Sequence, residues 1–310
     1  MGSQPNLAVN IGGIRMKNPV MTASGCYGYG LSYVDFYPPD LLGAMVVKGL
    51  YREAWRGNPP LRVVETPAGM LNAVGLEGPG VDSFICNELQ QLREYGATVI
   101  ANVAGHSVEE YACVAQRLSE AKGIAGLELN ISCPNVSQGG MAFGTDPRMI
   151  FELVSAVRKV TSLPVIAKLS PNVTDIRVTA RAAEDAGADA LSVINTLLGM
   201  SIDIRTRRPR LGNITGGLSG PAIRPVAIRM VWQVAQVVNI PIIGQGGIMT
   251  AEDAVEFILA GARAVAIGTA NFVNPMAPLQ VIEGLRQYCI ENNVDDINDL
   301  VGKVVIELGK

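Results

Sequence analysis

Short apolar runs, each introduced by glycine or proline, recur along the chain at roughly regular intervals. Each run is about four to eight residues long and apolar on both faces, as expected of a parallel strand covered by helices on one side and by packed core on the other. Eight candidate strands begin after Pro19, Gly43, Gly96, Gly126, Pro164, Gly187, Pro241 and Gly261.

Amphipathic segments fill the gaps between these runs. Residues 107–121 open with Ser107 and Glu110 at the spacing of a capping box, and apolar positions at helical intervals follow. Residues 146–160 open with Asp146 and a proline at the first helical position. Both segments are predicted to be helices.

Two further helices are predicted from their ends. Thr174 and Thr250 are expected to be N-caps, and Gly187 and Gly261 follow as left-handed residues after the last turn. The repeated order of helix, glycine and strand across residues 17–270 is typical of a (β/α)8 TIM barrel. A doubly wound open sheet is the alternative, because counting strands does not prove closure.

Insertions decorate this predicted barrel, and we treat residues 1–310 as one domain. The connections 50–82 and 196–220 follow strands, so they are expected over the C-terminal face, where such loops build active sites. The second holds a predicted small hairpin, in which Arg205–Arg210 is interpreted as a solvated rim. Near the N-terminus, a hairpin turning on Gly12-Gly13 is expected to plug the bottom of the barrel.

Composition narrows the class of protein. With 25 Lys and Arg against 28 Asp and Glu, the net charge of −3 offers no general attraction to nucleic acid. Five scattered cysteines without a C-x-x-C spacing predict reduced thiols, no metal site and a cytoplasmic location. The absence of a signal-like N-terminus and of a long apolar stretch predicts no membrane association.

Polar residues stand where several apolar runs give way to loops. A single polar residue at a strand end usually does no more than form hydrogen bonds with nearby backbone groups. Together, at the same end of a barrel, they converge on one pocket, and lysines there favour an anionic ligand because desolvation disfavours an unpaired charge. The five residues are Lys48, Asn102, Asn130, Lys168 and Asn195.

Two glycine-rich strand ends predict a phosphate site. The seventh run ends in residues 244–247 (GQGG) and the eighth in Gly268-Thr269. In barrels these two loops commonly hold phosphate, because glycine lets backbone N–H groups approach an oxyanion near a helix N-terminus. The alternative for each loop alone is a tight turn.

Cys133 is a candidate for chemistry because it follows the fourth run, between Ser132 and Pro134 and before a loop of small residues. A buried inert thiol is the alternative. As a base or nucleophile, a thiol with a pKa near 8.5 needs a nearby cation or a protected site. His106, the only histidine, is interpreted as a loop-capping residue rather than as its partner, and Cys26 is assigned no catalysis.

The motifs ELNISCPNV, GGMAFGTDP, AKLSPNVTDI, INTLLGM, NITGGLSGPAI and IPIIGQGGI resemble dihydroorotate dehydrogenase, a flavin mononucleotide (FMN) enzyme of pyrimidine synthesis built on a (β/α) barrel. The resemblance extends over residues 23–272. It implies that Cys133 is the base that takes the C5 proton of dihydroorotate while hydride leaves C6 for flavin N5.

The same resemblance implies binding residues for both ligands. Those implied for the substrate are Lys48, Asn72, Ala73, Val74, Gly75, Leu76, Asn130, Asn195 and Thr196. Those implied for the flavin ring and ribityl are Ser24, Lys48, Gly49, Asn102, Asn130, Lys168 and Ile194, and those implied for its phosphate are Gly220, Gly246, Gly247, Gly268 and Thr269. A cation such as Lys168 near flavin N1 stabilises the negative charge of the reduced ring.

A cysteine base resembles the soluble class of the family, and the motifs ASGCYGYG and RGNPPLRVVET resemble its NAD-linked branch. That resemblance implies a homodimer of this chain within a heterotetramer, whose second subunit carries FAD and a [2Fe-2S] cluster. This chain has no cysteine cluster or second nucleotide fingerprint of its own.

Four alternatives stay open from the sequence. The fumarate-using branch of the same family is one, and a related FMN barrel acting on dihydrouracil is another. A barrel aldolase or isomerase with Lys168 as a Schiff-base amine belongs to a different class. A non-catalytic scaffold is the fourth, although it leaves the polar strand ends without a purpose.

Overall fold

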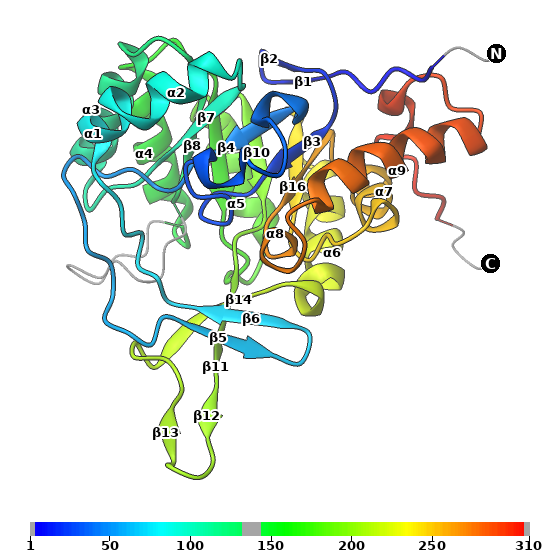
Figure 1. The fold of residues 1–310 in the computed structure, drawn as a ribbon. Coiled ribbons are helices and arrows are strands. Elements are labelled where there is room, and N and C mark those ends of the chain that lie inside the picture. Colours follow the sequence, from blue (N-terminus) through cyan, green and yellow to red (C-terminus); the bar gives the residue numbers. More distant parts are fainter. Residues whose placement is uncertain (1–3, 132–143, 307–310) are drawn as a thin grey trace.

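Eight parallel strands form a closed barrel in the computed structural model, which describes residues 4–131 and 144–306 (Figure 1). The strands are β3 (Val20–Thr22), β4 (Ala44–Val46), β7 (Val99–Val103), β8 (Ile124–Leu129), β9 (Val165–Leu169), β10 (Ala190–Val193), β15 (Ile242–Gln245) and β16 (Ala264–Ile267). Neighbours around the barrel run β3-β4-β7-β8-β9-β10-β15-β16 and back to β3. The predicted TIM barrel is confirmed, and closure excludes the open sheet.

Four predicted strand starts differ from the structure. Strands β7, β10 and β16 begin two residues later than predicted, at Val99, Ala190 and Ala264, and β8 begins earlier than predicted. Strand β8 begins at Ile124 rather than after Gly126, which lies inside the strand. A Cβ atom at Gly126 would come within 2.6 Å of Ile14 Cδ1, so this glycine makes room for a neighbouring side chain instead of ending a turn.

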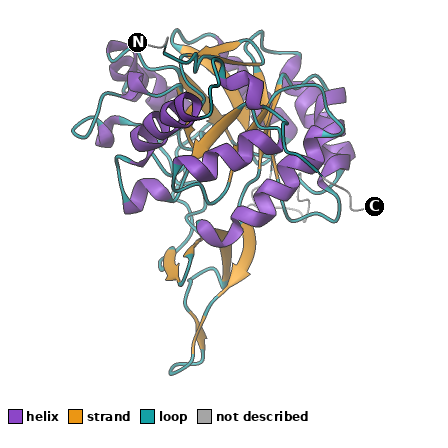
Figure 2. Ribbon diagram, turned by 90° about the vertical axis from the view of Figure 1, so that its right-hand side faces the viewer, coloured by secondary structure: helices purple, strands orange, loops and turns teal. Residues whose placement is uncertain are grey.

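Helices surround the strands on the outside (Figure 2). The α-helices are α1 (Val81–Cys86), α2 (Glu88–Glu94), α3 (Val108–Ser119), α4 (Pro147–Arg158), α5 (Ile176–Asp185), α6 (Arg224–Ala235), α7 (Ala251–Ala260), α8 (Ala270–Val273) and α9 (Ala277–Glu291). Short 3₁₀ helices are η1 (Leu31–Tyr33), η2 (Pro39–Leu41), η3 (Pro221–Ile223) and η4 (Ile297–Leu300). None of the helices within residues 4–131 and 144–306 has both the length and the hydropathy needed to cross a membrane.

Three of the predicted N-caps are confirmed. The side chains of Ser107, Asp146 and Thr250 accept hydrogen bonds from backbone N–H groups in the first turns of α3, α4 and α7. At α7 the capping box is complete, because Asp253 accepts in return from the backbone of Thr250. These bonds satisfy N–H groups that the helix itself leaves unpaired.

The fourth predicted N-cap is wrong. Asp175, not Thr174, caps α5, and its carboxylate accepts from the backbone and the side chain of Arg177. The ionised carboxylate is the stronger acceptor and also pairs with the guanidinium. At α3 the box is only half formed, because Glu110 accepts from the backbone N–H of His106 instead of that of the cap residue.

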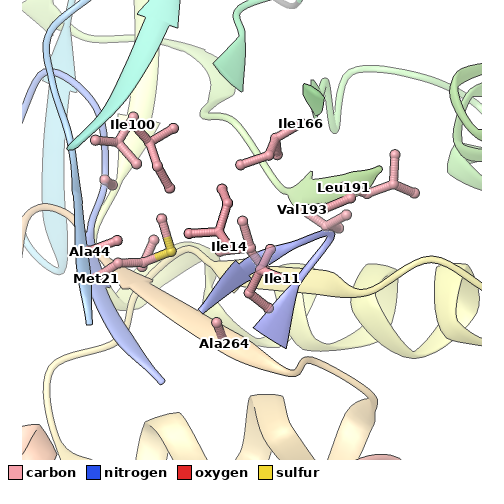
Figure 3. Close-up of a cluster of buried hydrophobic side chains, with 14 of the residues drawn as sticks. Ile11, Ile14, Met21, Ala44, Ile100, Ile166, Leu191, Val193 and Ala264 are labelled. Atoms are coloured by element: carbon pink, nitrogen blue, oxygen red, sulfur yellow. The ribbon is translucent and has the colours of Figure 1, made fainter. Parts of the chain in front are cut away.

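The predicted N-terminal hairpin lies across the amino end of the barrel. Its strands are β1 (Val9–Ile11) and β2 (Ile14–Met16). Figure 3 shows Ile11 and Ile14 lying among barrel side chains that include Ile100 and Ile166. The turn fits closely, because a Cβ at Gly12 would stand 2.6 Å from the backbone oxygen of Asp189, just before β10. The hairpin thus closes the bottom of the barrel with apolar side chains.

The two long connections combine into one sheet at the other end. The first supplies β5 (Val63–Thr66) and β6 (Gly69–Asn72), and the second supplies β11 (Leu197–Met200) and β14 (Thr215–Ser219). They pair in the antiparallel order β11-β14-β6-β5, at the end of the molecule away from the N-terminal hairpin (Figure 1). We call this four-stranded sheet the roof.

Beyond the roof projects the predicted small hairpin, which is formed by β12 (Ile202–Asp203) and β13 (Arg208–Pro209). Residues 205–210 are all exposed, as expected of a solvated rim.

Candidate active site

A pocket lies between the carboxyl ends of the barrel strands and the roof. Strand ends supply its polar floor, while β5, β6 and β14 supply residues from above, including Val63, Met70 and Ser219. The structure brings most of the sequence-predicted residues together here. Those that line the pocket are Ser24, Lys48, Gly49, Asn72, Val74, Gly75, Leu76, Asn130, Lys168, Ile194, Asn195, Thr196, Gly220, Gly246, Gly247, Gly268 and Thr269.

Two of the predicted residues that the structure describes do not line this pocket, and a third is not among the described residues. Ala73 is fully buried and packs in a small apolar cluster with Val64 and Leu71. Asn102 is also fully buried, one layer below the floor. Cys133, the predicted base, lies outside the described residues.

Lys168 stands at the floor with its ammonium held from two sides. The side chain projects from β9 and the residue is 5% exposed. Its Nζ lies 3.4 Å from the hydroxyl of Ser24 and 3.6 Å from a carboxylate oxygen of Glu128. Glu128, on β8, is itself only 1% exposed. The cation therefore has a fixed position and a counter-charge below the pocket.

Amide side chains form a hydrogen-bonded series that runs from beneath the floor into it. Asn102 donates to Glu128 at 2.7 Å, Asn130 donates to Asn102 at 3.4 Å, and Asn195 donates to Asn130 at 3.4 Å. The oxygen of Asn195 in turn accepts from the backbone N–H of Thr196 at 2.7 Å. Amides carry both donors and acceptors, so this array suits a planar ring with alternating N–H and C=O groups.

Lys48 is the second cation of the pocket. Burial lowers the pKa of its ammonium, while Glu77 raises that pKa and Arg62 lowers it. Within the described part of the chain no acceptor lies within hydrogen-bonding distance of its ammonium. A half-buried ammonium of this kind is stabilised by an anion in the pocket.

The glycine-rich loops lie at one side of the pocket. Gly220, Gly246 and Gly247 have positive φ angles of 95°, 125° and 83°, where L side chains are strained. A Cβ at Gly247 would also meet the backbone oxygen of Gly220 at 2.8 Å. Gly220 leads through η3 into the N-terminus of α6, so the predicted phosphate loops have backbone and helix geometry suited to an oxyanion.

His106 is placed on a loop that does not line the pocket. Its Nδ1 lies 3.0 Å from Glu110, and its ring stacks on that of Tyr51 with centroids 4.7 Å apart. These contacts agree with its interpretation as a loop-capping residue.

Sequence reasoning missed several pocket residues and one residue beneath the pocket. Cys26 lines the pocket, and burial raises the pKa of its thiol to about 11, with Lys168 acting in the opposite direction, so the thiol is protonated near pH 7. Glu128 lies inside an otherwise apolar strand. The only feature of the sequence that pointed to a buried ion pair was a charged residue at that position. The roof residues Met70 and Ser219 had no signal, because their approach depends on pairing between distant segments.

Taken together, the closed barrel, the amide-lined floor and the two lysines define the class: a (β/α)8-barrel protein with a pocket for an anionic ring compound at its C-terminal face. The family model described as dihydroorotate dehydrogenase matches residues 6–289. The chain belongs to the dihydroorotate dehydrogenase family.

Curated relatives match almost the whole chain. It is 54% identical over 302 residues to the "Dihydroorotate dehydrogenase B (NAD(+)), catalytic subunit" of Thermoanaerobacter pseudethanolicus, covering 97% of this chain and 100% of that protein. It is 58% identical over 297 residues to the protein of the same description from Desulforamulus reducens, covering 96% and 98%.

A solved structure supports the fold. The crystal structure of DHODH in complex with ferulenol from Eimeria tenella superposes with a TM-score of 0.81, covering 96% of this chain and 88% of that one at 22% identity. The aldolase and scaffold alternatives are not retained, because the family is established by sequence.

Proposed function

We propose that this chain is the catalytic subunit of an NAD-linked dihydroorotate dehydrogenase, which oxidises dihydroorotate to orotate in pyrimidine biosynthesis. The curated relatives carry that description over nearly their full length. The single observation that carries the proposal is the convergence of two lysines and three asparagines from the barrel and the roof, Lys48, Asn72, Asn130, Lys168 and Asn195, on one pocket.

Orotate fits the chemistry of this pocket in the proposal. Its carboxylate supplies an anionic acceptor for the half-buried Lys48 ammonium, which Glu77 influences only through its charge and which has no hydrogen-bond acceptor among the described residues. Asn72, Asn130 and Asn195 then pair with the ring N–H and C=O groups, since each amide donates and accepts. Thr196 and residues 74–76 complete the substrate side of the pocket.

FMN is the cofactor that we propose, and the residues present fit it. Lys168 would stand by the ring, with Ser24, Gly49 and Ile194 along it, and Asn102 would act from below the floor. Gly220, Gly246, Gly247, Gly268 and Thr269 would hold the phosphate. When bound, FMN supplies the electron acceptor for substrate oxidation.

Cys133 is proposed as the base that removes the C5 proton, on the strength of the family resemblance of the ELNISCPNV motif. We further propose a homodimer of this chain in a heterotetramer with a subunit carrying FAD and [2Fe-2S]. The words "catalytic subunit" in the relatives' names support the existence of a second subunit. The cytoplasmic location stays a prediction from the sequence.

Substrate choice tests the proposal. Purified chain, assayed with an electron-accepting dye, should oxidise dihydroorotate and leave dihydrouracil, which lacks the carboxylate, essentially unreacted. Turnover of dihydrouracil at a comparable rate would overturn the proposed substrate. Fumarate in place of the dye distinguishes the other branch, since an NAD-linked subunit is not expected to reduce it.

A further inference from the structure

A carboxylate lies inside the barrel, beneath the pocket. Glu128 is 1% exposed and does not line the pocket itself. It lies two residues before Asn130, and residues two apart on a strand share a face, so both side chains point into the barrel. A buried acid is costly unless it is paired, and this one has two partners.

The partners of Glu128 are a cation and an amide. Its Oε1 lies 3.6 Å from Nζ of Lys168 and accepts from Nδ2 of Asn102 at 2.7 Å. An ionised carboxylate accepts hydrogen bonds and donates none. Asn102 must therefore turn its nitrogen toward Glu128, which leaves its oxygen directed at Asn130.

This constraint passes along the chain of amides. The oxygen of Asn102 accepts from Nδ2 of Asn130, and the oxygen of Asn130 accepts from Nδ2 of Asn195. All three amides point their nitrogens toward Glu128, and the last oxygen accepts from the backbone of Thr196. Reversing one amide would place two oxygens or two NH₂ groups face to face. The carboxylate of Glu128, which can only accept, therefore sets the orientation of all three amides.

We propose that Glu128 is a positioning residue with two effects on the pocket. It fixes the orientation of the three amides, and it holds the Lys168 ammonium while partly neutralising its charge. The inference rests on the proposed function, in which Asn130 and Asn195 face orotate and Lys168 faces the flavin. Glu128 itself does not line the pocket in which both ligands are proposed to bind.

Two substitutions separate this role from packing. Glu128→Gln keeps the volume but adds a donor, so Asn102 is no longer held in one orientation. Glu128→Asp loses a methylene but remains acceptor-only. We expect the Kd for orotate, titrated on the purified flavin-loaded protein, to rise about ten-fold or more for Glu128→Gln and several-fold less for Glu128→Asp. A packing role predicts the reverse order, with the isosteric amide better tolerated.

The matched control is an acid in another barrel ion pair, at the opposite end. Asp189 pairs with Arg158 at 2.7 Å just before β10. Asp189→Asn should leave the Kd for orotate and the flavin potential unchanged. A change equal to that of Glu128→Gln would assign the effect to general loosening of the barrel and overturn the proposal.

The flavin potential supplies a second readout. Without the negative charge of Glu128, the positive charge of Lys168 acts in full on the reduced ring, so the midpoint potential of Glu128→Gln should become more positive. A ten-fold gain in preference for the two-electron reduced form corresponds to about 30 mV. Unchanged potential together with unchanged orotate affinity would overturn the inference.

Failure of the two proposals can be told apart. If the unaltered protein binds no flavin or no orotate, the proposed function is wrong; if it binds both and Glu128→Gln behaves like it, only the role of Glu128 is wrong. Should Glu128→Gln not fold, neutron diffraction from the unaltered protein shows the amide hydrogens directly. The ND₂ group of Asn102 must face Glu128, and the opposite orientation would overturn the proposal.

Discussion

At the scale of single residues, the pocket depends on charges that the barrel holds away from water. Lys168 has a buried counter-charge at 3.6 Å, whereas no acceptor stands beside Lys48 among the described residues. The two lysines therefore have different tasks in the account: one is a fixed positive charge near the cofactor, and the other gains an ion partner when an anionic substrate binds.

The lowered pKa of Lys48 predicts how orotate binding depends on pH. Burial lowers that pKa below its ordinary value of 10.5, and a bound carboxylate favours the ammonium form. Binding therefore takes up a proton above the lowered pKa, and the Kd for orotate should increase as pH rises through it. Lys48→Met should bind orotate about 10- to 100-fold more weakly near pH 7, the cost of one charged hydrogen bond, and should lack this pH dependence. Affinity that increases with pH in the unaltered protein would contradict this role.

Cys133→Ala tests the proposed base. The variant should keep its flavin, and its reduction by dihydroorotate should slow by about 10² to 10⁴, the usual contribution of a general base. Rapid mixing under anaerobic conditions measures the rate. Cys113→Ala, which alters an exposed thiol on α3, is the control and should reduce normally. An unaltered rate for Cys133→Ala would remove this residue from the proton transfer.

Most of the pocket could be predicted because its residues end strands, and the strand ends are visible in the sequence. Glu128 could not, since a charged residue inside an apolar run does not reveal its partners until β7, β8 and β9 are aligned. Ala73 was predicted to bind substrate because the residues around it resemble those of the family. Its side chain instead faces a small apolar cluster. Motif position does not determine the direction of a side chain.

At the scale of elements, the barrel is closed at one end by the N-terminal hairpin and covered at the other by the roof. The hairpin was predictable because its turn and its alternation of apolar and polar residues are local. The roof was not, because β6 pairs with β14 across about 145 residues of sequence, as the bond between Asn72 and Gly217 shows. Only tertiary structure brings those strands together.

The fit of the hairpin predicts a stability difference between two glycine substitutions. Gly12 and Gly96 both have positive φ, 57° and 68°, so alanine is strained at either site. At Gly12 a Cβ would also collide with Asp189, while at Gly96 it meets nothing within 4 Å. Gly12→Ala should lower the free energy of unfolding by about 1–3 kcal/mol more than Gly96→Ala, measured by urea denaturation. Equal losses would show that the hairpin does not pack tightly on the barrel.

At the scale of the whole molecule, closure of the barrel converts a series of separate strand ends into one site. Residues as distant in sequence as Lys48 and Thr269 line the same pocket because parallel strands all end at the same face. The roof then covers that face, so the pocket is enclosed between strand ends below and an antiparallel sheet above. The repeated glycine or proline before each apolar run predicted the barrel and its common face of strand ends. The sheet that covers this face is known only from the structure.

The absorption spectrum of the purified chain, recorded before and after anaerobic addition of dihydroorotate, tests the central claim most directly. We expect a yellow protein whose flavin band bleaches when dihydroorotate is added and is unaffected by dihydrouracil. A colourless protein, or a flavin band that dihydroorotate leaves unchanged, would contradict that claim.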